Sequence, residues 1–232
     1  MIYGFETFFT LIIAGVAFLI TLGAQIKINS SYNTYKKKDN SKKLSGQEVA
    51  RKILDENGLP NIHVVEVKGT LTDHYDPTNK VVRLSTDVFH GESVASLSIA
   101  AHECGHAIQD KEGYSLFRLR STIVPIVNFV SYAGYFVSLL SLFFGAMTYL
   151  KAGIFMLVAT LIFQLVTLPV EFDASERAKK EVSRLSLSNE KEDEEVKDVL
   201  FAAALTYVAG LVNTVLNILR FVIMINNEKD RR

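Results

Sequence analysis

Four long stretches of the chain are almost purely apolar, and polar segments separate them. The apolar stretches cover roughly 3–26, 122–147, 152–170 and 199–225. Each is about as long as the ~20 residues that cross a bilayer as a helix. The pattern therefore predicts four transmembrane helices.

The first long polar segment, 27–121, has the pattern of a small α+β region. Residues 45–59 begin with Ser45 as an N-cap, space their apolar side chains helically and end near Gly58 and Pro60, which predicts a short amphipathic helix. Residues 61–67 alternate as a strand does, and 69–85 predict two strands around a turn at 76–79. From Ser93 onward, a run rich in Ala, Leu and Ile predicts a helix that follows the sheet.

Composition alone does not separate a soluble from a membrane protein, although 49% of the residues are hydrophobic. The distribution of charge is more informative. Eight Lys and Arg residues lie between 27 and 52, against two acidic ones, and such an excess beside a membrane helix marks the cytoplasmic side. The first apolar stretch is also compatible with a cleaved signal peptide, but it lacks basic residues ahead of its apolar core, so we expect an uncleaved anchor.

This orientation gives the predicted organisation of the whole chain. The N-terminus and the turn near Lys151 are expected outside. The mildly basic tail points weakly the other way, but the stronger bias after the first helix decides the orientation. The expected order is a transmembrane helix (1–26), a cytoplasmic region (27–121), two transmembrane helices (122–170), a cytoplasmic segment (171–198), a fourth transmembrane helix (199–225) and an external charged tail (226–232).

The stretch AAHECGHAIQD, residues 100–110, carries two histidines one helical turn apart. On a helix, His102 and His106 share a face, so both imidazoles reach one ion, and Glu103 stands beside it. This is the HExxH arrangement, in which imidazoles bind Zn²⁺ and a carboxylate takes a proton from an activated water. The alternative is a helix whose histidines only satisfy buried polar partners. The small-residue helix after a short sheet favours zinc, with one ion per chain.

A catalytic zinc site needs a third protein ligand and an open fourth position. Glu112 stands where the extended metzincin pattern places a ligand, but that pattern requires a glycine where this chain has Gln109. Glu171 follows Pro169 at the end of the third apolar stretch, on the same predicted side of the membrane as the histidines. We favour Glu171 as the third ligand and keep Glu112 as the alternative.

Several motifs, in this order and between the apolar stretches, resemble the YugP-like family of bacterial membrane zinc metallopeptidases: LTDHYDP (71–77), AAHECGHAIQ (100–109) and LPVEFDASERA (168–178). The resemblance covers nearly the whole chain. It implies that His102, His106 and Glu171 are zinc ligands, that Glu103 is the catalytic residue, and that the protein lies in a bacterial cell membrane. The more distant HtpX-like membrane proteases have an aspartate four residues after the later glutamate. Here that position is Ser175, so the task of orienting a ligand is unassigned.

Other polar residues have less definite assignments. Asp173 is as compatible with a helix cap or a solvated acid as with a residue that supports a ligand. His74 is a candidate for substrate binding or transition-state stabilisation if the sheet edge flanks the cleft, and otherwise a surface residue. Cys104 points to another helix face than the histidines, which favours packing over metal binding, and a single cysteine forms no intramolecular disulfide. A polar stripe in the last apolar stretch either joins helices or lines a wet cavity: Thr206, Asn213, Asn217 and Arg220.

The sequence thus predicts an α-helical multi-pass membrane protein, with about four transmembrane helices and a small zincin-like α+β domain beside the membrane. Its first expected function is a membrane-embedded, gluzincin-like metalloendopeptidase with its active site at the cytoplasmic membrane surface. The alternative is a zinc-stabilised scaffold or adaptor without proteolytic activity. Structural zinc sites usually have four protein ligands, often thiolates, so the single cysteine favours the enzyme. Expected partners are the lipid bilayer and peptide or membrane-protein substrates, and no nucleic acid.

Overall fold

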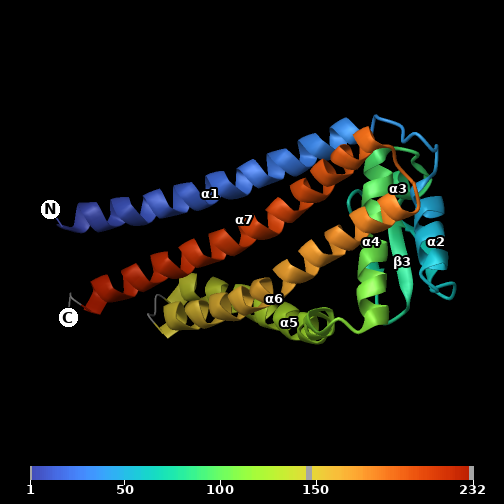
Figure 1. Ribbon diagram of the computed structural model, residues 1–232. Coiled ribbons are helices and arrows are strands. Elements are labelled where there is room, and N and C mark those ends of the chain that lie inside the picture. Colours follow the sequence, from blue (N-terminus) through green and yellow to red (C-terminus); the bar gives the residue numbers. More distant parts are fainter. Residues whose placement is uncertain (1, 145–147, 230–232) are drawn as a thin grey trace. The chain divides into compact units, whose positions relative to one another are not determined.

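The protein is described by a computed structural model that covers residues 2–144 and 148–229. The described residues form seven helices and three strands (Figure 1). In chain order these are α1 (Ile2–Tyr35), α2 (Gly46–Glu56), β1 (His63–Val67), β2 (His74–Asp76), β3 (Val81–Ser85), α3 (Thr86–His90), α4 (Val94–Glu112), α5 (Ser115–Phe144), α6 (Thr148–Arg184) and α7 (Glu190–Lys229).

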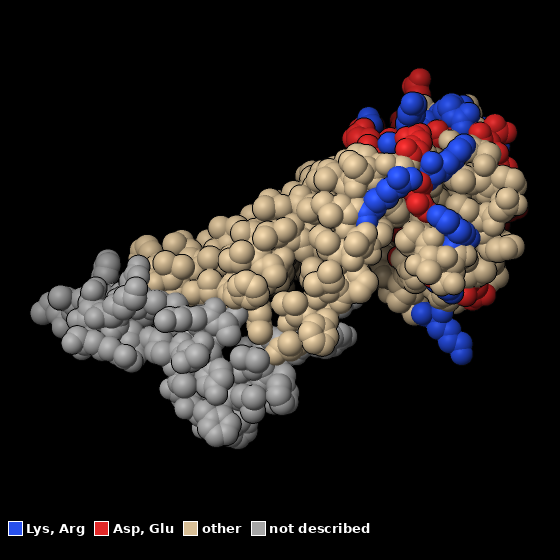
Figure 2. Space-filling view, turned by 90° about the horizontal axis from the view of Figure 1, so that it is seen from below, with Lys and Arg blue, Asp and Glu red and all other residues tan. Residues whose placement is uncertain are grey.

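The elements divide into two compact units. The first, here called the mixed unit, comprises Ile26–Arg118 and Pro169–Leu205 and contains the sheet, α2, α3 and α4. The second, the helical unit, comprises the described residues of 1–25, 119–168 and 206–232. Charged side chains are concentrated in the mixed unit. In the view of Figure 2, basic groups (blue) and acidic groups (red) lie together on this unit.

Three helices are long and apolar enough to cross a membrane: Phe8–Tyr35 in α1, Gly153–Arg184 in α6 and Glu190–Ile223 in α7. Large apolar side chains stand exposed along them, among them Phe18 at 65% and Phe155 at 73%. Water penalises large exposed apolar faces, whereas the acyl chains of a bilayer solvate them. The chain is therefore a mostly helical protein with three candidate membrane-spanning helices among its described residues.

The remaining predicted span, 122–147, overlaps α5, and its residues 145–147 lie outside the described residues. A fourth crossing stays a prediction. The third apolar stretch was expected to end at 170, but α6 continues without interruption from Thr148 through Pro169 to Arg184. Pro169 lacks only one amide donor, and its missing hydrogen bond does not prevent the helix from continuing on either side.

Helix α2 begins where its capping signal predicts. The Ser45 side chain accepts from the backbone N–H of Glu48, and the Glu48 carboxylate accepts from the backbone N–H of Ser45, which makes a reciprocal capping box. One face of the helix is buried in the core of the mixed unit through Val49, Ala50, Ile53 and Leu54. This confirms the predicted amphipathic helix.

The sheet has the strand order β1-β3-β2. Strands β2 and β3 pair antiparallel around the predicted turn, in which the Asp76 carboxylate accepts from the backbone N–H groups of Thr78 and Asn79. Strand β1 pairs with β3 in parallel, which the local pattern did not indicate. Strand β2 therefore lies at an edge of the sheet.

Helix α4 begins at the predicted N-cap, where the Ser93 hydroxyl accepts from the backbone N–H of Ser96, and ends at Gly113 in the left-handed conformation. Gly105, in the middle of α4, lies against α6. A Cβ atom at Gly105 would lie 2.5 Å from the carbonyl oxygen of Ala174. The missing side chain therefore allows the two backbones to approach closely, next to the position of Glu171.

Candidate metal centre

Helix α4 presents its two histidines side by side. His102 and His106 are one turn apart, with ring centroids at 4.8 Å and the ring planes at 81°. His106 is buried, and His102 is partly buried. The predicted arrangement of two imidazoles on one helix face is present.

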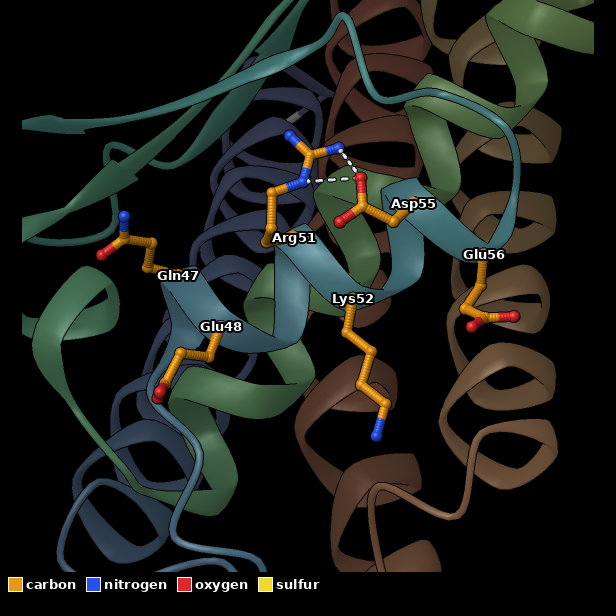
Figure 3. Close-up of a pocket in the computed structure, with 6 residues that line it drawn as sticks. All are labelled: Gln47, Glu48, Arg51, Lys52, Asp55 and Glu56. Atoms are coloured by element: carbon orange, nitrogen blue, oxygen red, sulfur yellow. Dashed lines mark hydrogen bonds and ion pairs between the residues drawn. The ribbon is translucent and has the colours of Figure 1, made fainter.

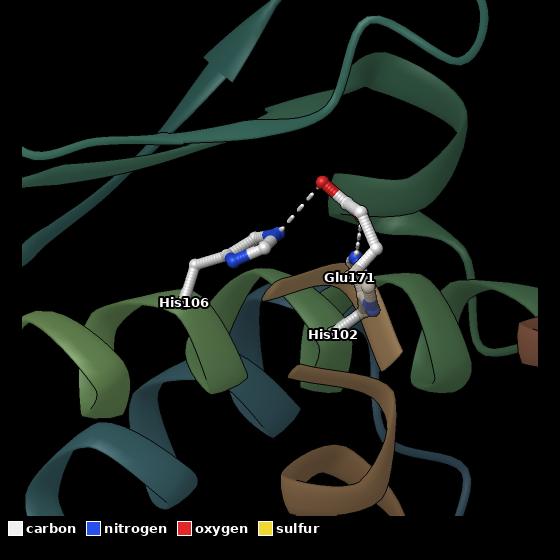
Figure 4. Close-up of side chains that lie close together, drawn as sticks. All are labelled: His102, His106 and Glu171. Atoms are coloured by element: carbon white, nitrogen blue, oxygen red, sulfur yellow. Dashed lines mark hydrogen bonds and ion pairs between the residues drawn. The ribbon is translucent and has the colours of Figure 1, made fainter. Parts of the chain in front are cut away.

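Helix α6 brings Glu171 to these imidazoles (Figure 4). The Glu171 carboxylate Oε2 lies 3.2 Å from His102 Nε2, and Oε1 lies 3.7 Å from His106 Nε2. One ligand atom from each of the three residues lies within 4.8 Å of the other two. His102, His106 and Glu171 thus form a group of side chains, among the described residues, that could hold one metal ion together.

The donor set fits zinc in type. Two imidazoles and one carboxylate form a common ligand set of catalytic zinc. One donor atom from each residue lies within 4.8 Å of the other two, close enough for the three residues to share one ion. Three protein ligands leave one tetrahedral position for water or substrate.

Glu103, next to His102 in the chain, is buried at 8% exposure, and its Oε2 accepts a hydrogen bond of 2.9 Å from the backbone N–H of Tyr75. The Tyr75 hydroxyl donates to Asp110 at 2.7 Å, so edge strand β2 is fastened to α4 at two points. Burial, followed by the bond to the Asp110 carboxylate, raises the pKa of Tyr75, and its hydroxyl stays protonated as a donor. The sheet edge thus holds the glutamate of the HExxH motif in place.

Two supporting residues were not predicted. Gln109 is fully buried, and its Oε1 lies 2.9 Å from His106 Nδ1. The Ser175 hydroxyl lies 3.3 Å from His102 Nδ1, at the position where HtpX-like proteases carry an aspartate. Helical spacing was the available signal, because Gln109 follows His106 by three residues and Ser175 follows Glu171 by four.

The structure separates the other candidates from the centre. Glu112 forms an ion pair with Arg177 at 2.6 Å and is not among the three clustered donors. Asp173 accepts hydrogen bonds from Gln109 and Arg177, so it belongs to the surroundings of His106 and not to the cluster itself. Glu171, and not the alternative Glu112, is the carboxylate placed beside the histidines.

His74 and Cys104 lie outside the cluster. His74 is exposed on edge strand β2, with Nδ1 2.8 Å from the carbonyl oxygen of Thr72. Cys104 is fully buried, its thiol contacts the carbonyl oxygen of Ala50 in α2, and burial raises the pKa of the thiol. Its packing role agrees with the expectation from helix geometry.

A surface hollow of about 480 Å³ also lies along α2 (Figure 3). Its six lining residues all come from this one helix, and Arg51 and Asp55 pair across one turn at 2.8 Å. The hollow is a charged outer helix face and contains no member of the metal cluster.

Residues 10–226 match the model of a family described as "Putative neutral zinc metallopeptidase". The chain belongs to this family. It is also 43% identical over 223 residues to the "Putative membrane protease YugP" of Bacillus subtilis (strain 168), an alignment that covers 96% of this chain and 97% of that protein. No solved structure matches the chain. Membership of this zinc peptidase family confirms the resemblance drawn from the motifs.

Proposed function

We propose that the chain is a membrane-embedded, zinc-dependent metalloendopeptidase with one Zn²⁺ held by His102, His106 and Glu171. The carrying observation is the convergence of these three donors from α4 and α6, with Glu103 adjacent on α4. Family membership and the protease name of the Bacillus relative support the same class of reaction.

The proposed mechanism divides the work between metal and protein. A zinc ion held by His102, His106 and Glu171 would make water more acidic and would polarise a peptide carbonyl. Glu103 accepts the proton of the attacking water on one carboxylate oxygen and delivers it to the departing amine. The Tyr75 N–H holds the other oxygen, Oε2, at 2.9 Å, so the carboxylate is oriented before substrate arrives.

The proposed location is a bacterial cell membrane, with the centre at its cytoplasmic surface. The basic residues between 27 and 52 favour the cytoplasm for the segment after α1. Glu171 belongs to a helix that is long and apolar enough to span the bilayer, so the centre lies close to lipid. We therefore expect peptides and membrane proteins cut near the inner surface as substrates.

Glu103→Gln separates the enzyme from a zinc-stabilised scaffold. The substitution keeps the size of the side chain and removes the base, so zinc content should persist while hydrolysis falls by roughly 10²–10⁴-fold. The measurement uses the full chain in detergent micelles with a peptide library, and mass spectrometry reads the cleavage.

Two controls make this test decisive. Gln47→Glu changes an exposed residue on the outer face of α2 and should leave cleavage unchanged. Cleavage at the parental rate by Glu103→Gln would refute the assigned base. A zinc-loaded parent that cleaves no member of the library would favour the scaffold.

A further inference from the structure

The second ring nitrogen of His106 is controlled by one buried amide. Gln109 Oε1 lies 2.9 Å from His106 Nδ1, and Gln109 has no exposed surface. A histidine that binds zinc through Nε2 must carry its proton on Nδ1 and usually donates it to a protein acceptor. The amide oxygen is such an acceptor.

The other contacts of Gln109 fix which way its amide faces. Its Nε2 lies 2.8 Å from the carbonyl oxygen of Val170 and 2.8 Å from Asp173 Oδ2. A carbonyl and an ionised carboxylate only accept, so both amide hydrogens are used there. Exchange of the amide oxygen and nitrogen would set the oxygen against two acceptors. The oxygen therefore faces His106, whose Nδ1 must donate.

The Asp173 carboxylate, which orients Gln109, is itself held in place by Arg177. Asp173 Oδ2 accepts from Arg177 Nε at 2.6 Å, and Arg177 also pairs with Glu112 at 2.6 Å. The relay thus runs from Glu112 through Arg177, Asp173 and Gln109 to His106. The two residues of α6 that Gln109 contacts, Val170 and Asp173, lie on either side of Glu171 in sequence. Gln109 therefore also joins α4 to α6 beside the proposed third ligand.

The other histidine contacts a hydroxyl group. Ser175 Oγ lies 3.3 Å from His102 Nδ1, and a hydroxyl either donates or accepts. This contact by itself does not select one tautomer, whereas the amide oxygen of Gln109 beside His106 Nδ1 only accepts.

We propose that Gln109 is a positioning residue that prepares His106 Nε2 for the metal, with Asp173 setting the orientation of the Gln109 amide. The proposal rests on the proposed zinc site. It assigns Glu112, the rejected ligand, to the outer end of the relay through Arg177.

Gln109→Met tests this role, because methionine keeps the volume of the side chain and removes the acceptor. Asn40→Leu is the matched control. Asn40 is also a buried amide of the mixed unit, which donates to Leu44 O and Glu92 O and accepts from Leu44 N, and it lies outside the metal cluster. Both variants should lower the unfolding midpoint of the zinc-free protein.

Zinc affinity separates the two variants. Competition with a chromophoric chelator, on the full chain in detergent, should show zinc binding about 10–100-fold weaker in Gln109→Met and unchanged in Asn40→Leu. The visible spectrum of the Co²⁺-loaded protein should change in Gln109→Met alone. Parental affinity in Gln109→Met, or equal weakening in both variants, would overturn the role of Gln109.

Asp173→Ala keeps the test open if Gln109→Met does not fold. About a third of the Asp173 side chain is exposed, so its removal disturbs packing little. We expect zinc binding to weaken severalfold, and unchanged affinity would overturn the relay. If the parental protein itself binds no zinc, the proposed function fails together with this inference.

Discussion

Glu171 carries a burial cost that the proposed zinc ion would offset. Its side chain is 3% exposed, and an ionised carboxylate at such depth costs several kcal/mol unless opposite charge offsets the loss of hydration. His102 and His106 contact the carboxylate, and a Zn²⁺ ion held by the three donors would supply the opposite charge. Glu112, by contrast, is exposed and already paired with Arg177, so it has no comparable need.

This difference predicts opposite results for the two glutamates. We expect the purified protein to carry roughly one zinc per chain, and Glu171→Ala should lose most of it because one of the three proposed ligands is gone. Glu112→Ala should keep its zinc, since it removes only the outer end of the relay. Elemental analysis after dialysis measures both. The assignment of the third ligand fails if Glu112→Ala loses its zinc while Glu171→Ala retains it.

Local spacing was sufficient to predict the two histidines and Glu103 on α4, but Gln109 on the same helix was not predicted. The histidines and Glu103 follow from the HExxH motif on a helix. The contact of Gln109 with His106 could have been predicted in the same way, because the two residues are three positions apart on that helix. The contact of Glu103 with the Tyr75 N–H was not accessible, because it joins residues 28 positions apart through the packing of a sheet edge on a helix. Such contacts depend on tertiary structure, and no local pattern encodes them.

At the scale of elements, the centre depends on how closely α4 and α6 approach. Gly105 faces the backbone of Ala174, three residues after Glu171, and a Cβ atom there would lie 2.5 Å from a carbonyl oxygen. A backbone atom cannot move away without shifting its whole helix. A larger residue at position 105 must therefore push α4 and α6 apart and separate the proposed ligands on the two helices.

Gly105→Ala should therefore weaken zinc binding and destabilise the protein by about 1–3 kcal/mol, as overpacking does. Gly23→Ala provides the control, since a Cβ at this helical glycine meets nothing within 4 Å. Thermal unfolding and chelator competition measure the two effects. Parental zinc affinity in Gly105→Ala would show that the close approach of the helices does not set the ligand geometry.

The elements themselves were predicted unevenly. Capping and turn signals located α2, the β2–β3 hairpin and the start of α4, because each signal acts within a few residues. The parallel pairing of β1 with β3 was not predicted, and the sequence did not decide whether the helix continues through Pro169. The first depends on a partner distant in sequence, and the second on a helix that tolerates one missing hydrogen bond.

At the scale of the whole molecule, the mixed unit constrains how the chain would cross a membrane. Residues 26–118 and 169–205 pack as one compact unit, so we expect them on one side of the bilayer, apart from helix ends that would enter it. The chain between them, 119–168, would then leave and return on the same side. If α6 spans the membrane, α5 must span it as well, which yields the fourth predicted crossing.

Cysteine labelling tests this topology in intact cells, with Cys104 replaced by alanine. Lys42 and Lys191 are suitable positions because both are exposed in the mixed unit, whereas Lys38 is paired with Glu195. Cysteines at Lys42 and Lys191 should resist an impermeant thiol reagent until lysis, because the basic segment after α1 favours the cytoplasm. Lys151 was expected in an external turn and lies near the start of α6, and a cysteine there should react without lysis.

Each departure from this result has a distinct meaning. Different labelling of Lys42 and Lys191 would contradict a single compact unit and with it the meeting of Glu171 with the two histidines. External labelling of both, with Lys151 protected, would invert the orientation and move the proposed active site to the outer surface. Protection of all three positions would mean that α5 and α6 do not cross as a pair. Glu171 would then reach the histidines on a helix that does not span the bilayer.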